Sequence, residues 1–181
     1  MGIFDVFKKD KGPDYDPANL KITDLRPGFI VDFDLKTWEV KEEYEYDWGN
    51  NYFTREFKLE AVDDLIYLFI DDNDELDISY SRKVKIRAVG EDIPEHIIKH
   101  QEAPKKIHYE GMDFFLDKES PGYFSDDPKN DDSWTELISW DYYDTSEEYI
   151  LSIQQWGDKE FDAAFGKVVK PFEFSNIIPG E

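Results

Sequence analysis

Cysteine is absent from this chain of 181 residues, and histidine is scarce, with three residues. A chain without thiols forms no disulfide, offers no thiolate nucleophile and builds no cysteine-based zinc site. Glycine loops that cradle phosphates (GxGxxG or GxxxxGKS/T) are missing, and so is the GxSxG nucleophile elbow. Because no recognised catalytic motif is present, we expect a non-catalytic protein without cofactor or metal.

Long apolar runs are also missing, so the sequence predicts no integral membrane segment. The first residues, MGIFDVFKKDKG, lack the apolar core of a secretory signal. Val6 stands where a myristoylation pattern requires serine or threonine. We expect a cytoplasmic protein in which residues 1–19 form a flexible N-terminal arm that Gly12, Pro13 and Pro17 keep irregular.

Positive charge is in short supply: 21 lysines and arginines face 43 aspartates and glutamates, giving a formal net charge of −22. Such a chain repels phosphate backbones and anionic membranes, which argues against nucleic-acid binding. Organic cations and basic protein segments are the partners that this charge favours, and solubility alone is the simplest explanation for it.

Aromatic residues are abundant, at 17%, and in residues 38–60 they follow the rhythm of a strand. Tyr44, Tyr46 and Trp48 alternate with acidic residues, which places the rings on one face and the carboxylates on the other. The segment Gly49-Asn50-Asn51 predicts a turn, so residues 37–60 are predicted to form a hairpin. The simplest interpretation is that the rings are core and the acidic face is solvated.

Similar patterns continue along the chain and predict a mainly β protein. Strands are expected at 29–34, 64–72, 83–89, 134–144 and 147–169, a polar loop at 120–133, and a short helix at 91–104. The segments IYLFIDDNDELDISYSRKV and YILSIQQWGDKEFDAAFGKVV share one order of features. We therefore expect two related antiparallel β modules, residues 20–90 and 105–181, each like a small barrel or sandwich, joined by the helix at 91–104.

The segment DLRPGFIVDFDLKTWEVKEEYEYDWGNNYFTREFKLE, together with IHYEGMDFFL and EEYILSIQQWGDKEF, resembles the uncharacterised bacterial domain-of-unknown-function 4178 family. The match lies in positions such as Pro27-Gly28, Trp38 and Gly166, and it covers roughly residues 20–178. The resemblance implies no catalytic residues. It implies an accessory role beside polyamine-synthesis-like enzymes or membrane-stress proteins, that is, in a bacterial stress or envelope-associated system.

Two patterns invite a metal hypothesis, and neither meets the requirements. His96 and His100 are four apart on the predicted helix, but Glu95 precedes the first histidine, where a zincin needs a glutamate after it. The acidic run from Asp71 offers oxygen ligands, but Leu76 stands where a calcium loop needs glycine. We interpret both as solvated surface.

Seven aromatic residues are left as candidates for a binding surface: Tyr44, Tyr46, Trp48, Tyr52, Tyr142, Tyr143 and Trp156. Rings set among carboxylates suit cations through cation–π contacts and ion pairs. One hypothesis is a scaffold that binds a basic protein segment; the alternative is a protein that binds, or acts on, a small organic cation such as a polyamine. A flat exposed aromatic patch favours the first hypothesis, and a deep pocket lined by carboxylates and rings favours the second.

Overall fold

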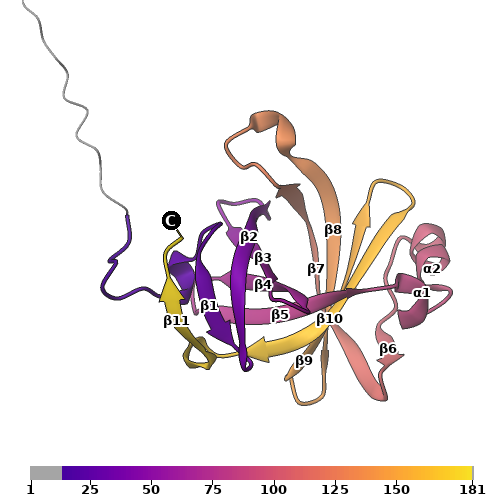
Figure 1. Cartoon of the computed structure of the whole chain (residues 1–181). Coiled ribbons are helices and arrows are strands. Elements are labelled where there is room, and N and C mark those ends of the chain that lie inside the picture. The colour runs from indigo at the N-terminus through magenta and orange to yellow at the C-terminus, as the bar shows by residue number, and fades with distance from the viewer. Residues whose placement is uncertain (1–13, 181) are drawn as a thin grey trace, which may run out of the picture.

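A computed structural model describes residues 14–180, so most of the predicted arm at 1–19 lies outside the described residues (Figure 1). The strands are β1 (Ile30–Phe33), β2 (Lys36–Asp47), β3 (Phe53–Glu60), β4 (Leu65–Asp71), β5 (Asp77–Val84), β6 (Lys106–Tyr109), β7 (Met112–Ser125), β8 (Thr135–Asp144), β9 (Tyr149–Trp156), β10 (Glu160–Val169) and β11 (Phe174–Ile178). The α-helices are α1 (Ile86–Val89) and α2 (Ile93–His100), and short 3-10 helices lie at Ile22–Asp24, Asp131–Ser133 and Pro171–Glu173. The prediction of a mainly β protein is confirmed.

The strands form one antiparallel sheet that returns on itself. Eight of them form a closed ring in the order β2–β3–β4–β5–β10–β9–β8–β7, because β7 pairs back to β2. The closing seam has three residue pairs, with Tyr46 opposite Phe124 at its middle. Strands β1 and β11 extend the sheet beyond β2, and β6 extends it beyond β7, so the ring is not a regular barrel.

The hydrophobic cores lie on the outer faces of this ring. Alternation along β3 and β4 sends Phe57, Leu59 and Leu68 to one core, which β1 and β11 cover. Alternation along β8 and β9 sends Trp140 and Leu151 to a second core, which α2 and β6 cover at the right of Figure 1. The opposite faces of β3 and β4 and of β8 and β9 are therefore directed toward the inside of the ring of strands.

The division into two modules, residues 20–90 and 105–181, is not confirmed, because one continuous sheet runs through both parts. Strand β5 pairs with β10, and β2 pairs with β7. The predicted helix at 91–104 is present as α2, which ends where Gln101 adopts a left-handed backbone with φ 56°.

Two local predictions are wrong. The strand predicted at 83–89 ends at Val84, opposite Ala163, and residues 86–89 form the helix α1, since Val89 packs with Ile93 in the second core. The polar loop predicted at 120–133 is a strand as far as Ser125. Gly122 permits this course because a Cβ atom there would lie 2.6 Å from the Trp48 ring.

Among the described residues, the longest helix is the eight-residue α2, and none has the length and apolar character that crossing a membrane requires.

Candidate binding cavity

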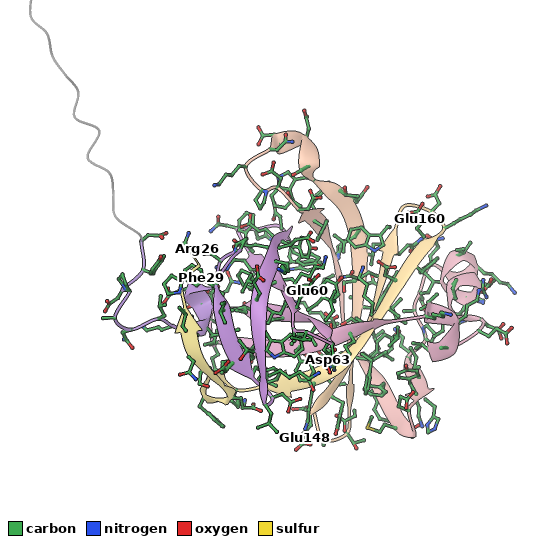
Figure 2. All side chains as sticks on the ribbon, in the orientation of Figure 1. Arg26, Phe29, Glu60, Asp63, Glu148 and Glu160 are labelled. Atoms are coloured by element: carbon green, nitrogen blue, oxygen red, sulfur yellow. The ribbon has the colours of Figure 1, made fainter. Side chains whose placement is uncertain are left out.

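A cavity of about 850 Å³ lies between the inner faces of the ring strands. Its walls follow from the same alternation that builds the outer cores. On β3, Thr54 and Glu56 face inward while Phe57 faces outward, and on β8, Ser139 and Asp141 face inward while Trp140 faces outward. Figure 2 shows the side chains of these strands as sticks on the ribbon. The volume lies within the roughly 300–1,000 Å³ of small-molecule sites.

Five rings form a continuous aromatic cluster on the cavity wall at the seam between β2 and β7. Tyr46 stacks on Trp48 with ring centroids 5.2 Å apart. Phe124 contacts Tyr44, Tyr46 and Trp156 at centroid distances of 5.3, 5.3 and 5.2 Å. The cluster therefore packs across the seam that closes the ring of strands, and it gives the cavity an apolar, electron-rich wall.

Glu56 is a carboxylate inside the ring without a charged partner. The Tyr46 hydroxyl donates to its Oε1 atom at 3.3 Å, and among residues 14–180 no lysine or arginine forms an ion pair with it. Burial raises the pKa of Glu56 to about 7, against the smaller opposing influence of the Tyr46 bond and the Lys83 charge. Near neutral pH the side chain therefore exchanges between its protonated and ionised forms.

Asp141 is a second such carboxylate, on β8. It accepts hydrogen bonds from the hydroxyls of Ser152, at 2.8 Å, and Ser139, at 3.4 Å. Burial raises the pKa of Asp141, while the Ser152 bond and the charge of Lys118 act in the opposite direction. Within the described part of the chain, it has no ion-pair partner either.

Two buried polar atoms beside the cavity have no hydrogen-bond partner among residues 14–180. They are the hydroxyl of Ser120, a residue that is 7% exposed, and the indole Nε1 of Trp156. Both residues line the cavity. An unpaired buried polar group costs about 1–3 kcal/mol, so these atoms favour a polar occupant.

The rim carries further charge, and much of it is paired. Lys83 pairs with Asp162 at 3.2 Å, Tyr52 donates to Asp71, and the Lys118 ammonium lies 5.5 Å from the centre of the Tyr52 ring. In total the lining holds nine carboxyl groups and three lysines, a formal charge of −6 when all are ionised: Glu42, Glu56, Asp71, Asp77, Asp117, Asp126, Asp141, Glu147, Asp162, Lys83, Lys118 and Lys170.

The seven aromatic candidates from the sequence divide between the cavity and the core. Six of them line the cavity: Tyr44, Tyr46, Trp48, Tyr52, Tyr143 and Trp156. Tyr142 is not among them. It is fully buried in the second core and donates to the Pro104 carbonyl at 2.9 Å, because it follows Asp141 on β8 and so points the opposite way. Whether the six rings bind a ligand stays a prediction.

The polar floor of the cavity was missed by sequence reasoning. Ser139 and Asp141 on β8, and Ser152 and Gln154 on β9, share the inward face. A signal was present, since these polar residues alternate with buried apolar ones in both strands. Among 43 acidic side chains, however, the sequence did not distinguish Glu56 and Asp141 from the solvated ones.

Of the two metal patterns, the histidine pair lies away from the cavity, whereas Asp71 of the acidic run lines it. His96 and His100 are exposed on α2, with ring centroids 4.7 Å apart. Asp71 uses its carboxylate to accept from Tyr52 and from the Asn73 backbone. In residues 14–180 no group of three histidine, aspartate or glutamate side chains is placed to hold a metal ion.

Comparison with known proteins identifies relatives without adding an activity. The family described as "Domain of unknown function (DUF4178)" matches residues 26–171. An uncharacterized protein of Aquifex aeolicus is 23% identical over 155 residues, which cover 86% of this chain and 83% of the relative. No solved structure matches.

Proposed function

The chain belongs to the DUF4178 family, a domain of unknown function, and we propose from its inner cavity that it binds a small organic cation, such as a polyamine. The observation that carries the proposal is the pair of inward-facing carboxyl groups, Glu56 and Asp141. Both have a raised pKa, and neither has an ion-pair partner among the described residues.

Electrostatics favours a cationic occupant over a neutral or anionic one. Removing a carboxylate from water costs several kcal/mol unless a counter-charge and hydrogen bonds replace the lost hydration. Within the part of the chain that the structure describes, only the Tyr46 hydroxyl donates a hydrogen bond to the Glu56 side chain. A bound ammonium group supplies both the charge and the donors. The six-carboxylate excess of the lining also disfavours phosphates and carboxylates as ligands.

The aromatic cluster supports the same conclusion. A cation over the face of a tyrosine or tryptophan gains about 0.5–2 kcal/mol, with the larger values in desolvated sites. Lysines already use ring faces in this way at the rim, as Lys118 does over Tyr52. The six candidate rings surround a concave space, and a concave space is the geometry expected for a small ligand.

A basic protein segment is the second candidate, favoured by the overall charge of −22. In either form we propose a non-catalytic binding protein of the bacterial cytoplasm, with an accessory role in a stress or envelope-associated system. A protein segment would reach the cavity only through a lysine or arginine side chain entering at the rim, so the two candidates make different predictions for free amines.

Calorimetry and tryptophan fluorescence test the proposal directly, since Trp48 and Trp156 line the cavity. We expect saturable binding of putrescine and spermidine and none of butanediol, which has the shape of putrescine without its charge. Glu56→Gln and Asp141→Asn should each weaken binding at least tenfold. Glu136→Gln, an exposed site on β8, and Asp74→Asn, an exposed loop site, are the matched controls. Failure of every amine to bind, with saturable binding of a lysine-rich peptide, would favour the second candidate.

A further inference from the structure

We infer that the cavity recognises a linear primary diammonium ion, one end of which pairs with Glu56 and the other with Asp141. This inference rests on the proposed function and specifies its ligand class. The inference predicts that a diammonium ion binds more tightly than an alkylamine with a single charge or a quaternary ammonium ion.

The first reason is that the two unpartnered carboxyl groups stand on different walls. Glu56 lies on β3 and Asp141 on β8, and these strands are separated in the ring by β2 and β7 on the shorter side. Among the described residues they share no hydrogen-bond donor: Tyr46 donates to Glu56, and Ser139 and Ser152 donate to Asp141. An ammonium group beside Glu56 would therefore meet the Tyr46 hydroxyl, and one beside Asp141 would meet the hydroxyls of Ser139 and Ser152.

The second reason is that the Glu56 end lies beside the aromatic cluster. The Tyr46 hydroxyl lies 3.3 Å from Glu56, and the Tyr46 ring contacts Phe124 at a centroid distance of 5.3 Å. The spacer between the two charges would run along Tyr46 and Phe124 of the aromatic cluster, where methylene groups are well accommodated.

The third reason is the hydroxyl environment of the Asp141 end. Ser139 contacts Asp141 and lies opposite Ser120 in the pairing of β7 with β8. Ser120 is a residue that is 7% exposed and lines the cavity, and its buried hydroxyl has no partner within the described residues. A primary ammonium has three N–H donors, so it can serve a carboxylate and serine oxygens together. A quaternary ammonium has no N–H and leaves the serine oxygen unpaired.

The experiment compares amines of the same apolar size but different charge on the full chain by calorimetry. The probes are putrescine, butylamine and tetramethylammonium, with ethylenediamine and cadaverine to vary the spacer. We expect putrescine to bind about 30-fold more tightly than butylamine, because losing one partner of a buried charge pair costs roughly 2 kcal/mol or more. We also expect Glu56→Gln and Asp141→Asn each to remove most of that advantage, and Glu136→Gln to preserve it.

The outcomes separate this inference from the proposed function. Butylamine binding within threefold of putrescine, with both still sensitive to Glu56→Gln, would overturn the diammonium inference and leave a monocation site. Tetramethylammonium binding as tightly as putrescine would overturn it as well. Failure of all the amines to bind would overturn both proposals. Circular dichroism of each variant shows whether the sheet is retained, and both substitutions remove charge without adding volume.

Discussion

Replacing Glu56 with glutamine should stabilise the protein, and the gain should grow with pH. Burial raises the pKa of Glu56 from 4.5 to about 7 in the folded protein. Between these values the folded state binds more protons than the unfolded state, so the stability that this group contributes falls as pH rises. Each pKa unit corresponds to about 1.36 kcal/mol, so the ionised side chain costs about 3 kcal/mol above neutral pH.

Glutamine does not titrate, and its amide oxygen can still accept from Tyr46. The difference in unfolding free energy between Glu56→Gln and the parent should therefore be small near pH 4 and approach about 3 kcal/mol near pH 8. Urea unfolding followed by tryptophan fluorescence at several pH values measures this difference. Comparing the variant with its parent at each pH cancels the titration of all other groups.

The control is Glu136→Gln, because Glu136 is exposed on the outer face of β8 and does not line the cavity. Its pH profile should stay parallel to that of the parent. A Glu56→Gln difference that is constant from pH 4 to pH 8 would refute the reasoning, since it would show that the ionised carboxylate is well solvated. The cavity would then hold enough water to make a cationic occupant unnecessary.

Two further predictions test the architecture. Gly166→Ala should destabilise the protein by about 3 kcal/mol, because a Cβ atom there would lie 1.8 Å from the Tyr80 carbonyl oxygen where β10 pairs with β5; an unchanged urea midpoint would show that the strands are further apart. Tyr142→Phe should cost about 1 kcal/mol through the lost bond to the Pro104 carbonyl and leave amine binding unchanged. Weaker putrescine binding in that variant would place Tyr142 at the cavity after all.

The local part of the fold was predictable because strand alternation is a property of neighbouring residues. Tyr44 and Tyr46 share a face of β2, Trp48 directly after the strand lines the same cavity, and the hairpin turn falls between Asp47 and Phe53, as the pattern predicted. The extent of β7 was not predictable in this way. Its passage through Pro121 and Gly122 depends on the neighbouring Trp48, which is 74 residues away from Gly122 in the sequence.

The sequence by itself determined which side chains share a strand face, since a period of two is imposed by the backbone of each strand alone. It did not determine what each face meets. The pairing of β2 with β7 and of β5 with β10 closes the ring of strands. Only this pairing places the aromatic side chains of β2 on the inner side of the ring and the apolar faces of the strands against two outer cores. The same pairing brings Glu56 and Asp141 into one cavity. This could not be predicted, because a local sequence pattern does not show which distant strands pair.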